Sequence, residues 1–227
     1  MIDPAPTEAG RRTFGLAPGE RRAALGFAGF GVLAMLVVVL VRLALDVPVP
    51  TLTRDPAFTF DYPDWVGALS HLGVLAWAAA ASVALLGASI AAPGEARRFL
   101  TRAGLLTVVL AFDDLFQGHE NVGGLLFYSG ELVIFALYGL AIVLMVSGSR
   151  RYIRESTPVA VLAVAAVLLG FSQLIDRFTY LPARLLLEDG SKFLGVLAWL
   201  LYLAIVARRE CAGAALAAAD RARPPAR

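Results

Sequence analysis

Long apolar stretches, separated by short polar connections, make up most of the chain. Runs of about 20 apolar residues are typical of helices that cross a bilayer, because a hydrocarbon core of about 30 Å needs that many residues at the helical rise. Transmembrane strands would instead alternate in polarity over about 10 residues. The runs here are continuous and rich in Leu, Ala and Val. The pattern therefore predicts an all-α integral membrane protein.

The apolar stretches divide into six predicted spans. They cover residues 22–47, 64–91, 100–118, 124–146, 158–180 and 186–207. We expect residues 1–20 to be a disordered cytoplasmic arm, residues 21–210 to form a six-helix transmembrane bundle, and residues 211–227 to be a cytoplasmic tail. The third span is the shortest and carries two adjacent aspartates near its end.

The distribution of positive charge predicts the orientation of this bundle. With six spans, 15 of the 20 Lys and Arg residues fall on one side: in the N-terminal arm, the second and fourth connections, and the C-terminal segment. Lys and Arg favour the cytoplasmic ends of spans. The sequence therefore predicts that both termini are cytoplasmic, and we expect a bacterial inner membrane as the location.

Composition narrows the chemistry further. Cys211 is the only cysteine, which excludes an intramolecular disulfide and a cysteine-based metal motif. The net charge of +2 is too small to indicate a nucleic-acid partner. The expected partners are the lipid bilayer and a lipid-like substrate, with a second membrane protein as an alternative.

Ionisable residues gather at the outward ends of the predicted spans. Both histidines of the chain, His71 and His119, lie in this layer. Its carboxylates outnumber the nearby cations, and they are Asp113, Asp114, Glu120, Glu131, Asp176, Glu188 and Asp189. Clustered carboxylates in a medium of low dielectric constant are stabilised by shared protons or by a bound cation.

The densest motif in the layer lies at the end of the third span. At helical spacing, Asp113, Gln117 and Glu120 share one stripe, whereas Asp114 points about 100° away. Gly118 is placed to cap this helix, so that His119 would fold back over the mouth of the bundle.

For two other acidic residues of the layer, Glu188 and Glu131, a structural role and a functional role are the alternatives. Glu188 and Lys192 have the spacing of an intrahelical ion pair, so a structural role explains them equally well. Glu131 has no basic residue within its own predicted span, which favours a functional role.

These residues predict a metal-dependent enzyme, a hydrolase or an oxidoreductase, acting on a lipid or other amphipathic substrate. The predicted metal ligands for zinc, iron or manganese are His71, Asp114, His119, Glu120, Glu131 and Glu188. The predicted catalytic residues are Asp113, Glu120, Asp176 and Lys192. Two alternatives stay open: an accessory subunit of a membrane complex, and a proton or cation transporter. The apolar inner halves of the spans argue against transport.

Overall fold

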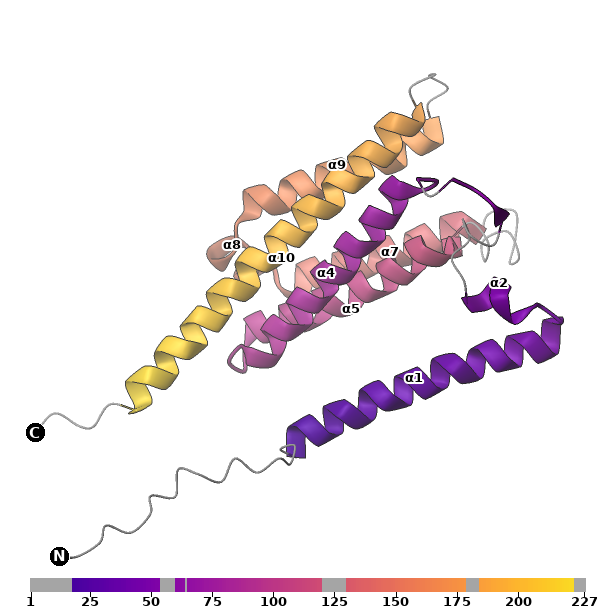
Figure 1. Ribbon diagram of the computed structural model, residues 1–227. Coiled ribbons are helices and arrows are strands. Elements are labelled where there is room, and N and C mark those ends of the chain that lie inside the picture. The colour runs from indigo at the N-terminus through magenta and orange to yellow at the C-terminus, as the bar shows by residue number, and fades with distance from the viewer. Residues whose placement is uncertain (1–17, 54–59, 64, 120–129, 179–183, 223–227) are drawn as a thin grey trace, which may run out of the picture. The chain divides into compact units, whose positions relative to one another are not determined.

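The six apolar segments of the sequence coincide with six long helices (Figure 1). The computed structural model describes residues 18–53, 60–63, 65–119, 130–178 and 184–222, and the regular secondary structure of these ranges is entirely helical. The long helices are α1 (Pro18–Leu45), α4 (Ala68–Ile90), α5 (Glu95–Phe116), α7 (Gly130–Gly148), α9 (Val159–Phe178) and α10 (Arg184–Ala222). Two short helices are α2 (Val49–Thr53) and α8 (Arg150–Ser156). The predicted all-α class is confirmed.

The helices differ in their ability to cross a membrane. Among the described residues, α4 and the part of α10 from Leu185 are long and apolar enough to span one, and α7 with α8 forms a third candidate that is bent by 66°. The apolar parts of α1 and α9 are shorter. Helix α5 carries charged residues in its first two turns and again in its last. The six-span bundle with cytoplasmic termini therefore stays a prediction.

Contacts divide the chain into two units, and the boundary between them in the sequence falls after Val66. In the first unit, Arg42 in the last turn of α1 forms an ion pair with Asp46. Asp46 follows the helix with a φ of 52°, a left-handed conformation that aspartate tolerates better than most residues. Helix α2 begins shortly afterwards, so the chain turns directly after α1.

The second unit is built around α4, which packs against both α5 and α10. The buried face of α4 consists mainly of alanine and glycine, repeated at helical spacing. Small side chains allow helix backbones to approach closely. Large side chains from the neighbouring helices complete the core, and the fully buried ones include Phe99, Leu100, Tyr202 and Leu203.

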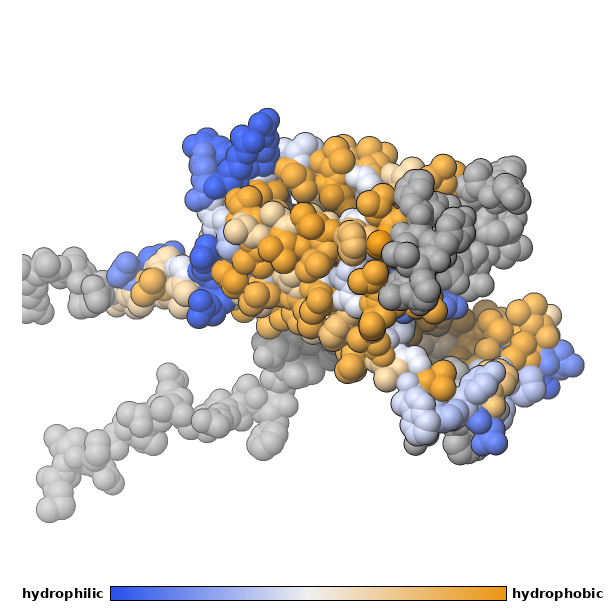
Figure 2. Space-filling model, turned by 90° about the horizontal axis from the view of Figure 1, so that it is seen from above, coloured by the Kyte–Doolittle hydropathy of each residue, from blue (hydrophilic) through white to orange (hydrophobic). Residues whose placement is uncertain are grey.

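Helix α10 is the longest element and also packs along α9. A buried hydrogen bond of 2.9 Å from Trp199 Nε1 to Thr107 Oγ1 joins α10 to α5. The helix continues beyond the predicted sixth span to Ala222, so most of the predicted tail is helical. Helix α7 lies beside α5 and contacts it at fewer positions than α4 does. Much of the surface seen in Figure 2 is hydrophobic, as expected of helices that face lipid.

Candidate functional site

The site forms where α5 ends. Helix α5 stops at Phe116, and Gln117 caps it in the left-handed conformation, donating its backbone N–H to the carbonyl of Asp113. We predicted Gly118 as the capping residue, and this prediction is wrong by one position. The glycine has a different role: a Cβ at Gly118 would lie 2.8 Å from Asp113 Oδ1. The missing side chain leaves room for the carboxylate.

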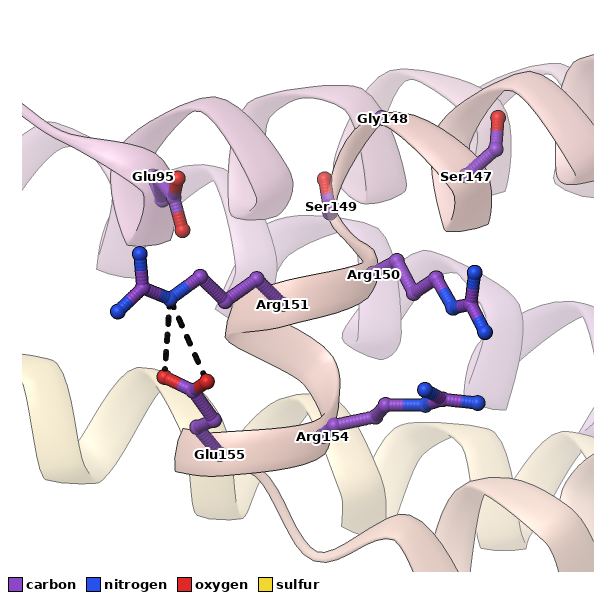
Figure 3. A pocket seen from close by; sticks show the side chains of 8 residues that line it. All are labelled: Glu95, Ser147, Gly148, Ser149, Arg150, Arg151, Arg154 and Glu155. Atoms are coloured by element: carbon purple, nitrogen blue, oxygen red, sulfur yellow. Dashed lines mark hydrogen bonds and ion pairs between the residues drawn. The ribbon is translucent and has the colours of Figure 1, made fainter.

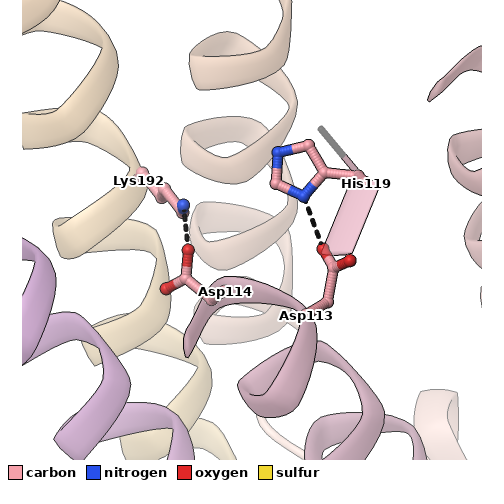
Figure 4. Close-up of polar contacts among 4 residues, drawn as sticks. All are labelled: Asp113, Asp114, His119 and Lys192. Atoms are coloured by element: carbon pink, nitrogen blue, oxygen red, sulfur yellow. Dashed lines mark hydrogen bonds and ion pairs between the residues drawn. The ribbon is translucent and has the colours of Figure 1, made fainter. Parts of the chain in front are cut away.

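His119 folds back onto Asp113 (Figure 4). The distance from His119 Nδ1 to Asp113 Oδ2 is 2.7 Å, and the two side chains are only 17% and 12% exposed. Because an ionised carboxylate can only accept, Nδ1 carries the proton, and in the neutral ring Nε2 is then the basic nitrogen. Phe135 of α7 packs on the imidazole, with ring centroids 5.2 Å apart. Tyr138 of the same helix packs edge-on against Phe135, with ring centroids 6.5 Å apart.

The neighbouring aspartate faces another helix. Lys192 of α10 donates a hydrogen bond to Asp114 Oδ1 and forms an ion pair with it. The Asp114 side chain is 10% exposed and that of Lys192 34%. Consecutive residues on a helix point about 100° apart, so the two aspartates have separate partners in Figure 4. The end of α5 thus holds a histidine–aspartate pair next to a lysine–aspartate pair.

Both pairs line one end of a cavity of about 1330 Å³. Helices α5, α7 and α9 supply most of its wall, and the middle of that wall is apolar. Leu132 and Val143, both over 60% exposed, belong to it, so the cavity opens towards the surroundings of the protein. Its volume exceeds the usual range for a drug-sized ligand, which is about 300–1,000 Å³.

Ser172 of α9 is the most unusual polar group on this wall. It is 1% exposed, and its Oγ has no hydrogen-bond partner among the described residues. Buried hydroxyls are normally satisfied, so an unpartnered one beside a cavity suggests a position that a ligand or water occupies.

The other predicted site residues either do not line this cavity or lie outside the residues that the structure describes. His71 is exposed in the first turn of α4, beside Gly67. Glu188 is partly buried in α10. Glu120 and the side chains of Glu131 and Asp176 lie outside the described residues.

The predicted metal centre is not supported by the residues that the structure describes. No group of three or more His, Cys, Asp or Glu side chains among them is arranged to hold a metal ion. Asp114 instead contacts the ammonium of Lys192, and His119 contacts Asp113. Because three of the predicted metal-site and catalytic residues fall outside the description, the metal stays a prediction.

Tyr138 was missed by the sequence reasoning, although a signal for it exists. It lies seven residues after Glu131, so the two positions share a face of α7. Reading that face as a polar stripe would have indicated a phenol near the acidic layer. No comparable sequence signal indicates Phe135, because an aromatic residue in an apolar helix has no distinguishing pattern.

Substituting Gly118 by alanine is expected to disrupt the histidine–aspartate pair. The new methyl group would displace Asp113 Oδ1, and His119 would lose a charge-assisted hydrogen bond worth about 1.5–3 kcal/mol. The chain has two histidines, so NMR of protein with isotope-labelled histidine can follow the tautomer of each ring. We expect the Nδ1-protonated fraction of His119 to fall in Gly118→Ala. Gly190→Ala is the control, because a Cβ there meets no atom within 4 Å. An unchanged His119 spectrum in Gly118→Ala would contradict this packing.

Comparison with known proteins gives a family and no further relatives. Neither a curated protein nor a solved structure matches the chain. One family model matches residues 29–206, a range that begins within α1 and ends within α10 and so includes both aspartate pairs. The chain belongs to this family, which is described as a domain of unknown function, DUF8692.

Proposed function

We propose that this protein is a membrane-embedded enzyme that acts on an amphipathic, lipid-like substrate, with the His119–Asp113 pair as its general base. The observation that carries the proposal is the combination of a large apolar cavity with a shielded histidine–aspartate pair at one end. The apolar wall of the cavity accommodates the hydrocarbon part of such a substrate. The polar group of the substrate then lies at the end of the cavity that holds the two aspartate pairs.

The proposed chemistry follows from the orientation of the imidazole. With Nδ1 donating to Asp113, Nε2 accepts a proton from a hydroxyl group or a water molecule, and Asp113 stabilises the resulting imidazolium. Phe135 packs on the imidazole and helps to hold its orientation. The ammonium of Lys192 lines the same end of the cavity, where it would stabilise negative charge that develops on the substrate.

The distribution of Lys and Arg along the sequence supports a side of the membrane for the histidine–aspartate pair. Asp113 lies near the outward end of the predicted third span, away from the side on which most arginines lie. We therefore place the histidine–aspartate pair towards the periplasmic leaflet of a bacterial inner membrane. A substrate would enter sideways from that leaflet, through the exposed part of the cavity wall.

Replacing His119 by glutamine is expected to abolish the reaction. The purified full-length protein, in nanodiscs, would be incubated with a total bacterial membrane lipid extract, and lipid species would be followed by mass spectrometry. We expect the wild type to convert at least one lipid species and His119→Gln to convert it at least about a hundredfold more slowly, as is typical when a general base is lost.

The second histidine provides a matched control. His71 is exposed, so His71→Gln should convert the same species at the wild-type rate. If the wild type alters no lipid, or if conversion persists in His119→Gln, the proposed function is wrong.

A further inference from the structure

Two arginines lie at the opposite end of the same cavity, where the chain bends by 66° between α7 and α8. Arg150 and Arg154 are four residues apart and therefore share one face of α8. In Figure 3 their guanidinium groups extend alongside each other, whereas Arg151 points the other way. The arrangement presents two adjacent cationic groups, each capable of several hydrogen bonds.

The charges around this pair leave it without an internal counterion among the described residues. Arg151 contacts Glu155, with distances of 3.2 and 3.3 Å from its Nε to the carboxylate oxygens. Neither Arg150 nor Arg154 has an ion pair or hydrogen bond with a described side chain. Glu95 is the other carboxylate that lines the hollow around these residues, and in that lining three arginines outnumber two acids. The local charge therefore favours an anion.

Two hollows of different character meet at these arginines. A hollow of about 410 Å³ is lined by polar and charged residues, among them Glu95, Ser149 and Glu155. The large apolar cavity begins on the other side, and Ser147, Arg150 and Arg154 line both. A polar compartment joined to an apolar one has the shape required by a headgroup and its hydrocarbon chain.

The length of the apolar wall suits one leaflet of a bilayer. Tyr138 and Ser147 are nine positions apart in α7, and both line the cavity. At 1.5 Å per residue this corresponds to roughly 14 Å along α7, a little less than half of the hydrocarbon core of about 30 Å. An acyl chain that starts at Arg150 would therefore end near Tyr138.

We propose that Arg150 and Arg154 bind the phosphate of an anionic phospholipid whose acyl chain lies in the cavity between α7 and α9. Guanidinium groups match phosphate oxygens in a bidentate manner, which favours arginine at such sites. The phosphate-binding end of this site lies at the other end of the cavity from the histidine–aspartate pair. It does not depend on the proposed reaction.

The test measures binding of dioleoyl phosphatidylglycerol and dioleoyl phosphatidylcholine to the purified full-length protein by native mass spectrometry. We expect a preference for phosphatidylglycerol in the wild type. Arg150→Gln/Arg154→Gln should weaken its binding roughly thirtyfold, since each basic residue near an anionic lipid contributes about fivefold. Arg97→Gln/Arg98→Gln removes the same charge from exposed positions of α5 outside the cavity, and should weaken binding much less.

A second variant tests the apolar part of the site. Gly139 lines the cavity, and a Cβ there meets no atom within 4 Å, so Gly139→Leu should fold and occupy the space of the acyl chain. It should weaken phosphatidylglycerol binding, whereas His119→Gln should not. This contrast separates the lipid site from the proposed enzyme.

Three results would overturn the proposal. The first is equal binding of the two lipids by the wild type. The second is an equal loss with the Arg97 and Arg98 control, which would indicate general electrostatic attraction. The third combines two observations: inorganic phosphate displaces phosphatidylglycerol at a similar concentration, and Gly139→Leu binds phosphatidylglycerol as well as the wild type does. Together they would indicate a site for small anions.

Discussion

Replacing Lys192 by methionine is expected to lower the free energy of unfolding by about 3 kcal/mol. The substitution keeps the apolar stem but leaves the Asp114 carboxylate, which is 10% exposed, without its cation. Removing one member of a buried ion pair costs about 3–5 kcal/mol, and the partial exposure of Lys192 places the expected loss at the lower end. Unfolding by sodium dodecyl sulfate in mixed micelles, followed by tryptophan fluorescence, would measure it.

Two controls distinguish a stranded charge from a general packing defect. Asp114→Asn/Lys192→Met removes both charges and should recover most of the loss, because a neutral pair needs no counterion. Arg42→Met breaks the ion pair with Asp46, in which both side chains are well exposed, and should change stability by less than about 1 kcal/mol. A double variant as unstable as Lys192→Met would show that the ion pair is not the cause.

The partner of Lys192 illustrates how far the sequence could lead. Its spacing from Glu188 is also that of an ion pair within one helix, whereas the structure joins Lys192 to Asp114 of α5. Spacing along a helix is visible in the sequence, but a contact between α5 and α10 depends on how α4 packs between them. The sequence did indicate that these residues lie at a common depth. It could not indicate which of them meet.

The helices themselves were largely predictable, and their ends were less so. Continuous apolar runs marked all six long helices, because a long stretch without polar residues has few other stable conformations in a membrane. Charge at Arg208 and Arg209 ended the sixth predicted span, but α10 continues to Ala222. Arginine is a good helix former, so polarity can end a span without ending the helix.

The cavity could not be predicted at all. It arises because α7 packs less closely than α4 does, and because α8 turns away from α7 after Gly148. Neither property has a periodic pattern in the sequence. The arginines of α8 were interpreted only as markers of the cytoplasmic side, although Arg150 and Arg154 also line a cavity large enough for a lipid acyl chain.

The close approach of α4 and α10 gives the second large stability effect: Gly87→Leu is expected to lower the free energy of unfolding by about 3 kcal/mol. A Cβ at Gly87 would lie 2.6 Å from Ala207 Cβ and 3.1 Å from Ala207 Cα. The second contact involves backbone, so the helices would have to separate, and overpacking of this kind typically costs about 1–3 kcal/mol. Leucine favours helix, so the loss would reflect packing and not propensity. The same unfolding titration would measure it.

The steric origin of this effect can be tested at both sides of the contact. Gly87→Ala should cost less than Gly87→Leu, and adding Ala207→Gly should restore part of the loss, because it removes the nearer of the two contacts at Ala207. Gly213→Leu is the matched control in α10, where a Cβ meets no atom within 4 Å, and it should leave stability unchanged or slightly raised. If Gly87→Leu were as stable as Gly213→Leu, α4 and α10 could not be packed as closely as the structure shows.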